Sequence, residues 1–164
     1  MVIINLTYDR RKNLFSIPVI LVKRTKNSIG TAPGKTEKSF EVMYLDTGSN
    51  LTSITDIEAG KLNLDTSTFK PQKVGGIGGF VDTPTTDEVD IYVQGDKDTL
   101  QVKLDRIAVH PSQIRKKVKK KSGMYAERGE RSAEMISLFG LDALEKLGGK
   151  LEINMREKTG TITT

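Results

Sequence analysis

The sequence predicts an all-β domain built from short antiparallel strands. Its 164 residues are enough for one domain with a single core. Runs rich in Val, Ile and Thr are short and are separated by polar turns, and 15 glycines and five prolines favour tight turns over long helices. Charged residues make up 29% of the chain and hydrophobic residues 36%, which is typical of a globular protein. We therefore expect residues 1–164 to form one mainly β domain.

The composition excludes several kinds of catalytic site. The chain has no cysteine, so it has no thiol nucleophile, disulfide or cysteine-ligated zinc. Its only histidine, His110, precedes Pro111 and is expected in a loop, and no Gly-x-Ser-x-Gly motif is present. Carboxylate chemistry without a metal or other cofactor is therefore favoured. The first residues do not resemble a signal peptide and no run is long enough to span a membrane, so we expect a cytoplasmic location.

The N-terminal part predicts three strands. Residues 2–8 and 14–22 are β-rich and flank a polar turn, which predicts a hairpin, and Pro18 places the second strand at a sheet edge or a bulge. Residues 23–38 are polar and predict a long exposed loop. In residues 39–45, Phe40, Val42 and Tyr44 alternate with Glu41 and Met43, which predicts a strand whose buried face carries the first three.

The turn after this third strand carries Asp46, Thr47, Gly48 and Ser49. A carboxylate, two hydroxyls and a glycine at a strand end are suited to a catalytic turn, although the same residue types also favour an ordinary surface turn. Thr55 and Glu58 form a capping-box pattern that predicts a helical turn over about residues 56–61. Residues 64–67, Leu-Asp-Thr-Ser, lack the glycine and are not expected to form a second site.

A glycine-rich segment covers residues 74–81, Val-Gly-Gly-Ile-Gly-Gly-Phe-Val. Four glycines around one isoleucine with β-prone residues on both sides predict a hairpin with a glycine-rich tip. The spacing does not fit Gly-x-Gly-x-x-Gly and no helix is expected next, so a phosphate-binding loop is disfavoured. A second hairpin is expected over residues 89–93 and 100–104.

The C-terminal third contains a basic segment and a short helix. Residues 110–132 carry a net charge of +6, against +5 for the whole chain, and predict a solvated loop inserted after a strand that starts at residue 107. Asp142 as N-cap, Glu145 and Gly148 predict a helix whose buried face holds leucines 141, 144 and 147. A strand follows at 150–154, and residues 155–164 are expected to form a further hairpin over Thr159 and Gly160.

Three of these motifs, in this order, resemble the retropepsin-like (retroviral-type) aspartic proteases. They are the Asp-Thr-Gly-Ser turn, the Gly-Gly-Ile-Gly-Gly-Phe segment and the apolar-apolar-Gly element before the last helix. The resemblance covers about residues 16–154, and departs at the loop before the third strand and at the basic insertion. It implies a closed β-barrel with a flap hairpin and one short C-terminal helix, and a final strand that pairs between subunits. Because this chain has one Asp-Thr-Gly, the resemblance implies a homodimer in which each subunit supplies Asp46.

The resemblance also implies an aspartic endopeptidase acting on peptide or protein substrates. Two carboxylates held together share one proton, so one can activate water while the other protonates the scissile carbonyl. Thr47 would brace the dimer, and Gly48 would approach the pair through its backbone. If Ser49 donates to Asp46, it stabilises the charged carboxylate and favours an acidic optimum. The flap residues that would cover the substrate are Gly75, Gly76, Ile77, Gly78, Gly79 and Phe80.

Two alternatives remain open from the sequence. The first is a non-catalytic dimerisation or peptide-binding module with the same fold. The second is binding of a nucleic acid or another anionic partner through the insertion. In a variant of the peptidase hypothesis, the insertion lies beside the substrate cleft and favours acidic substrates. The basic residues concerned are Arg115, Lys116, Lys117, Lys119, Lys120 and Lys121.

Overall fold

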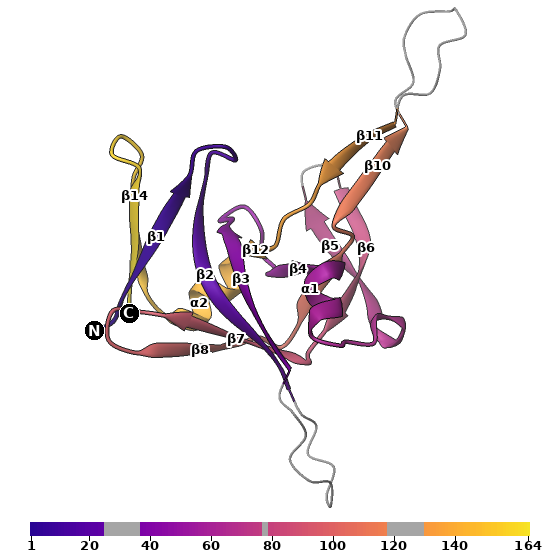
Figure 1. The fold of residues 1–164 in the computed structure, drawn as a ribbon, viewed down its shortest axis with the longest axis horizontal. Coiled ribbons are helices and arrows are strands. Elements are labelled where there is room, and N and C mark those ends of the chain that lie inside the picture. Colours follow the sequence, from indigo (N-terminus) through magenta and orange to yellow (C-terminus); the bar gives the residue numbers. More distant parts are fainter. Residues whose placement is uncertain (25–36, 77–78, 118–129) are drawn as a thin grey trace, which may run out of the picture.

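The computed structural model describes residues 1–24, 37–76, 79–117 and 130–164 (Figure 1). The side chains of residues 75–81 and 114–133 lie outside this description. The described part is mostly β structure with two short α-helices and one 3₁₀ turn. No helix within it is long and apolar enough to cross a membrane.

The structure contains the strands and helices predicted from the sequence together with elements that were not predicted. The strands are β1 (Ile3–Asp9), β2 (Leu14–Lys23), β3 (Lys38–Leu45), β4 (Ser53–Thr55), β5 (Lys70–Gly76), β6 (Gly79–Thr86), β7 (Val89–Gln94), β8 (Thr99–Lys103), β9 (Ile107–His110), β10 (Gln113–Lys117), β11 (Glu130–Glu134), β12 (Leu138–Phe139), β13 (Lys150–Asn154) and β14 (Thr159–Thr163). The helices are α1 (Asp56–Lys61), the 3₁₀ turn η1 (Thr66–Thr68) and α2 (Leu141–Leu147). The elements that were not predicted are β4, η1, β10, β11 and β12.

Twelve of the described strands form one sheet. Its path runs β13-β14-β1-β2-β3-β12-β4-β9-β6-β5, with the β7–β8 hairpin joined to β2. Most pairs are antiparallel, but β12 runs parallel to β3, and β4 runs parallel to β9. Within the described strands the path has two free ends, at β13 and β5, so the closed barrel predicted from the sequence is not found. Strands β13 and β14 form a C-terminal hairpin, and β14 also pairs with β1. Its turn lies at residues 155–158, and Thr159 and Gly160 belong to β14, so the prediction of a hairpin over these two residues is wrong.

The core confirms the strand pattern but corrects the predicted face of β3. Met43 is fully buried and Leu45 is buried, whereas Phe40 is 74% exposed and Val42 is 53% exposed. A period of two fixes which residues share a face of a strand, but it does not say which face is inside. Here Met43 and Leu45 pack with β2 residues such as Ile17 in the core cluster, so β3 presents its other hydrophobic side chains to solvent.

Pro18 shows how a proline fits inside the sheet. The sequence placed its strand at an edge or a bulge, but β2 pairs with β3 along its length, from Ser16 to Val22. On its other side, β2 pairs with β1 up to Ser16 and with β7 from Val19. Pro18 lies in the gap between these two partners, so its missing N–H interrupts no hydrogen bond there.

The basic insertion is also more ordered than the predicted loop. Its two ends form the antiparallel β10–β11 hairpin, paired from Gln113↔Glu134 to Lys117↔Glu130. Figure 1 shows this hairpin projecting from the body of the molecule. Residues 118–129 lie outside the described residues. The ends of the chain lie side by side, because Val2 and Thr164 exchange two backbone hydrogen bonds of 2.9 and 3.0 Å.

Candidate active site

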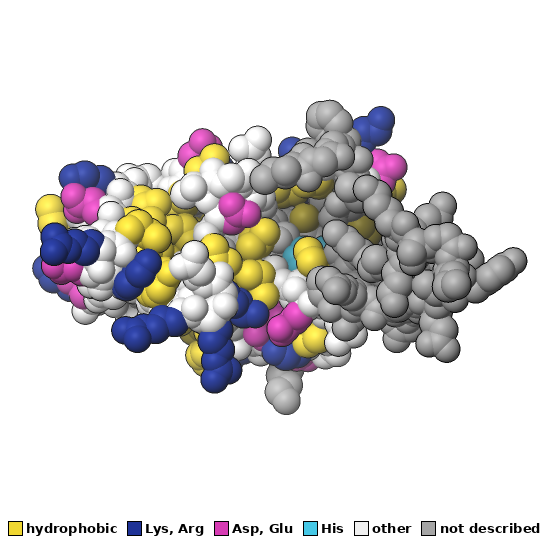
Figure 2. Space-filling view, turned by 90° about the horizontal axis from the view of Figure 1, so that it is seen from above, with side chains coloured by type: hydrophobic (Ala, Val, Ile, Leu, Met, Phe, Trp, Pro, Cys, Tyr) yellow, Lys and Arg dark blue, Asp and Glu magenta, His cyan; other side chains and the backbone are white. Residues whose placement is uncertain are grey.

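The Asp46 turn connects two strands that lie on either side of β12. Leu138 of β12 pairs with Tyr44 of β3 on one side and with Ser53 of β4 on the other. The turn therefore passes over the end of β12, at the upper end of β3 in Figure 1. Figure 2 views the molecule from the side toward which β3 runs, and hydrophobic side chains are exposed along the middle of this face.

Backbone hydrogen bonds join the turn to the segment that follows β12. The Asp46 N–H donates to the Phe139 carbonyl (3.1 Å), and the Leu141 N–H donates to the Ser49 carbonyl (2.8 Å). Within the turn, the Ser49 N–H donates to the Asp46 carbonyl (3.2 Å). The turn is thus fixed at both of its ends to residues far away in the sequence.

The Asp46 carboxylate is anchored through one oxygen. Its Oδ1 accepts a hydrogen bond from the Gly48 N–H at 2.9 Å, and Oδ2 has no partner among the described residues. Asp46 is half-buried, while Thr47 and Gly48 are exposed. The turn therefore presents one free carboxylate oxygen together with the exposed Thr47.

Ser49 does not have the predicted role. Its hydroxyl donates to the Leu51 carbonyl at 2.8 Å and not to Asp46. The Oγ also accepts from the Leu51 N–H at 3.4 Å, so Ser49 stabilises the second half of the turn. The argument from Ser49 for an acidic optimum therefore no longer applies.

A buried brace ties the turn to α2. Thr52 is fully buried; its N–H and its hydroxyl donate to Asp142 Oδ1 at 2.9 and 2.6 Å. The Thr52 Oγ1 also accepts from the Gly140 N–H at 3.0 Å. Asp142 was expected to cap α2, but the N-cap is Gly140, and Asp142 reaches across to Thr52 instead. Sequence patterns missed this contact because the two residues are 90 positions apart.

Residue 140 must be a glycine because neighbouring backbone atoms leave no space for a side chain. A Cβ on this residue would lie 2.8–2.9 Å from backbone atoms of Leu51 and Thr52, which real Cβ atoms do not tolerate. Its own backbone is extended, so the constraint is close approach and not an unusual φ. The predicted capping glycine of α2, Gly148, is present with φ +65°.

The strands on either side of the glycine-rich tip pair with each other, as the predicted hairpin requires. Strands β5 and β6 pair from Lys70↔Thr85 to Gly75↔Phe80 and Gly76↔Gly79. Ile77 and Gly78 at its tip lie outside the described residues. Strand β6 joins β9, and β9 joins β4, so the hairpin and the Asp46 turn belong to the same run of strands.

Beside the turn, Tyr44 connects β3 to the β1–β2 hairpin. Its hydroxyl donates to Asp9 Oδ2 at 2.8 Å, and this hydrogen bond is the main cause that holds the pKa of Asp9 below its usual 3.8. Burial, followed by the bond to Asp9, raises the pKa of Tyr44 above its usual 10.0. Lys12 lies 5.5 Å from the centre of the Tyr44 ring and contacts Glu134 at 3.6 Å.

The structure describes only some of the basic residues that the sequence analysis named as a possible binding site for an anionic partner. Arg115, Lys116 and Lys117 belong to β10, and nothing is described of their side chains; Lys119, Lys120 and Lys121 lie outside the described residues. The Asp65 of the Leu-Asp-Thr-Ser segment caps η1 by accepting from the Ser67 N–H. Among the described side chains, no group of three or more His, Asp or Glu is arranged to hold a metal ion.

The chain was compared with known families, curated proteins and solved structures. No family model and no curated protein matches it. One similar solved structure is a retropepsin-like aspartic protease from Rickettsia conorii, with 15% identity and a TM-score of 0.47 over 99% of this chain and 91% of that chain. Another is EIAV protease complexed with the inhibitor HBY-793, with 17% identity and a TM-score of 0.41 over 79% of this chain and 100% of that chain.

Proposed function

We propose that this chain is the subunit of a homodimeric aspartic endopeptidase whose catalytic pair consists of Asp46 from each of two copies. The observation that carries the proposal is the way Asp46 is held. One carboxylate oxygen is fixed by Gly48, and the turn is tied to Phe139, Leu141 and α2, while the other oxygen has no partner among the described residues. A rigid, half-buried carboxylate at a surface turn is suited to meet its symmetry mate.

The chemistry follows from bringing two such carboxylates together. Because their negative charges repel, the pair holds one proton between them. The ionised carboxylate takes a proton from water as the water attacks the scissile carbonyl carbon, and the protonated carboxylate donates to the carbonyl oxygen. A proton then passes to the leaving nitrogen, and both carboxylates return to their starting state. The β5–β6 hairpin is the element that would cover the substrate and exclude water.

Two features support a dimer. The chain has a single Asp-Thr-Gly, so a pair of these turns requires a second copy. Strand β13 pairs only with β14 among the described strands, and its outer edge is free to pair with another strand. Ile153 of β13 and the adjacent Met155 are both exposed, which places hydrophobic side chains at this edge.

The test is cleavage of a diverse peptide library by the wild type and Asp46→Asn, with the dimer fraction measured under the same conditions. Aspartate and asparagine are close in size, but the amide cannot act as the ionised base. We expect discrete cleavage that the substitution abolishes while the dimer fraction is unchanged. Cleavage that persists in Asp46→Asn contradicts the proposal, and a folded dimer that binds peptides without cleaving them favours the non-catalytic module.

A further inference from the structure

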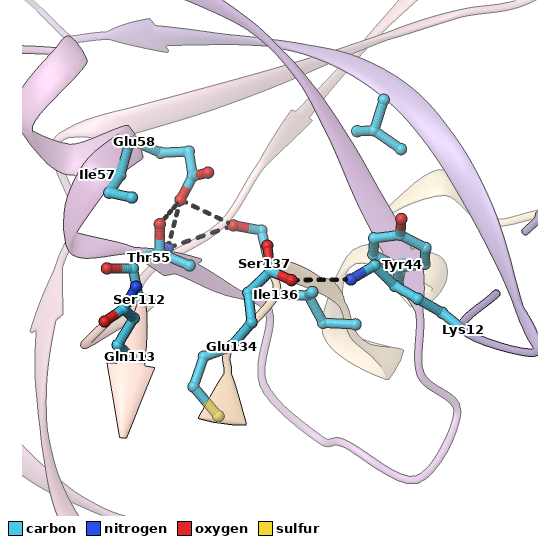
Figure 3. A pocket seen from close by; sticks show the side chains of 12 residues that line it. Lys12, Tyr44, Thr55, Ile57, Glu58, Ser112, Gln113, Glu134, Ile136 and Ser137 are labelled. Carbon is cyan, nitrogen blue, oxygen red and sulfur yellow. Dashed lines mark hydrogen bonds and ion pairs between the residues drawn. The ribbon is translucent and has the colours of Figure 1, made fainter. Parts of the chain in front are cut away.

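A pocket of about 490 Å³ lies beside the candidate active site (Figure 3). Its walls come from four places in the chain: the turn between β1 and β2, β3, the N-terminal part of α1, and the base of the β10–β11 hairpin with the segment that leads from it to β12. Val42 and Tyr44 of β3 line it, and they share a face of the strand with the position of Asp46. Because side chains on one face of a strand recur about every 6.6 Å, Val42 lies roughly 13 Å from Asp46 along the strand direction.

Glu58 provides a fixed carboxylate in this pocket. Its Oε2 accepts from the Thr55 N–H (2.7 Å), from the Thr55 hydroxyl and from the Ser137 hydroxyl (3.1 Å). Figure 3 shows these bonds converging on one oxygen while the other points away from them. That oxygen, Oε1, has no hydrogen-bond partner among the described residues. Three donors hold the group in place and leave one acceptor for a ligand.

The charge of Glu58 is not neutralised inside the pocket. The other charged residues that line it, Lys12 and Glu134, pair with each other at 3.6 Å. Lys61 of α1, which does not line the pocket, donates to Glu41 at 2.7 Å, and this bond is the main cause that raises its pKa; the charge of Glu58 makes a smaller contribution. The pocket is therefore an acidic site on a chain whose net charge is +5.

Part of the remaining lining is hydrophobic, and the rest consists of polar residues such as Ser112 and Gln113. Val42 and Ile57 are 53% and 54% exposed, and Met135 and Ile136 also line the pocket. Exposed hydrophobic walls combined with one free carboxylate oxygen match a ligand that has a hydrocarbon stem and a cationic head. Lysine and arginine side chains have both features.

We infer that this pocket binds a lysine or arginine side chain of the polypeptide substrate, with its stem against Val42, Ile57 and Ile136 and its head on Glu58 Oε1. This inference rests on the proposed peptidase function. For an extended peptide that runs alongside β3 and advances about 3.3 Å per residue, the basic residue lies about four positions from the scissile bond. The base of the basic insertion thus forms part of a recognition site.

The test compares peptides that differ only by lysine or norleucine at positions three to five residues from the scissile bond. Norleucine keeps the stem and removes the charge. We expect the wild type to prefer one lysine peptide by about tenfold in kcat/KM, equivalent to about 1.4 kcal/mol. Glu58→Gln, which preserves the capping-box pattern, should cleave the two peptides alike. The matched control Glu145→Gln removes an exposed charge on α2 and should keep the preference.

A second variant and a binding measurement complete the design. Ile57→Lys places a cation at an exposed position of the pocket and should also abolish the preference, whatever the stability of Glu58→Gln. Binding of the two peptides to Asp46→Asn separates the two proposals. If the wild type cleaves neither peptide but peptide binding depends on Glu58, the proposed peptidase function is refuted and the proposed binding pocket is retained. Asp46-dependent cleavage without a lysine preference, or a preference that survives Glu58→Gln, refutes the pocket.

Discussion

Replacing Thr52 by valine tests how far the buried brace supports the Asp46 turn. Valine has nearly the same shape but no hydroxyl, so Thr52→Val removes the 2.6 Å bond to Asp142 and the acceptor of the Gly140 N–H. A hydrogen bond to a charged group contributes about 1.5–3 kcal/mol, and a buried donor left without a partner costs about 1–3 kcal/mol. We therefore expect the free energy of unfolding to fall by roughly 3–5 kcal/mol, a large part of the ~5–15 kcal/mol typical of a domain.

The measurement is urea unfolding at fixed subunit concentration, because dimerisation makes apparent stability depend on concentration. Thr52→Ser is the matched control: it keeps the hydroxyl and loses one methyl group, which should cost about 1 kcal/mol. The midpoint of Thr52→Val should shift far more than that of Thr52→Ser, with the slope m unchanged. A loss below about 1 kcal/mol for Thr52→Val would refute the reasoning, since it would mean that the brace contributes little to stability.

Two further predictions concern stability. Tyr44→Phe removes the hydrogen bond that lowers the pKa of Asp9. The substitution should therefore lower the free energy of unfolding at neutral pH, and this loss should shrink as pH falls through the lowered pKa of Asp9. Urea unfolding at pH 7 and about pH 2 checks this, and a loss of unfolding free energy that is the same at both pH values contradicts it. Gly60→Ala in α1, where a Cβ has free space, should raise the free energy of unfolding by about 0.5–1 kcal/mol, whereas Gly148→Ala should lower it by about 1 kcal/mol because Gly148 has φ +65°. Thermal unfolding of the two variants should therefore shift in opposite directions.

Local patterns in the sequence predicted the elements well. Thr55 and Glu58 marked the start of α1, and the capping box is present. Gly148 marked the end of α2 because only a residue that tolerates a positive φ stops a helix in this way. The antiparallel pairing of β5 with β6 agrees with the hairpin that the glycines of residues 75–79 indicated, whose tip lies outside the described residues. Each of these signals acts over a few residues, so each can be recognised without the rest of the fold.

The errors arose where distant residues decide the outcome. Asp142 has the sequence position of a cap, but a buried threonine 90 residues earlier takes its carboxylate. Ser49 lies close to Asp46 in sequence, yet its hydroxyl donates to the Leu51 carbonyl. The outward face of β3 is hydrophobic at Phe40 and Val42, so hydrophobicity alone gave the wrong side. The Glu58 pocket requires α1, β3 and the β10–β11 hairpin to be assembled first.

The pairing of β1 with β14 has a consequence for how the chain folds. Ile3 pairs with Thr163, so the first strand has its partner at the opposite end of the sequence. During synthesis, β1 can form its short ladder with β2, but the edge that β14 covers stays open until β14 has left the ribosome. Contacts between such distant segments also slow folding, because a long loop must close before they form. Completion of this part of the sheet is therefore expected to be a late step, during which the unpaired edge of β1 is exposed to other chains.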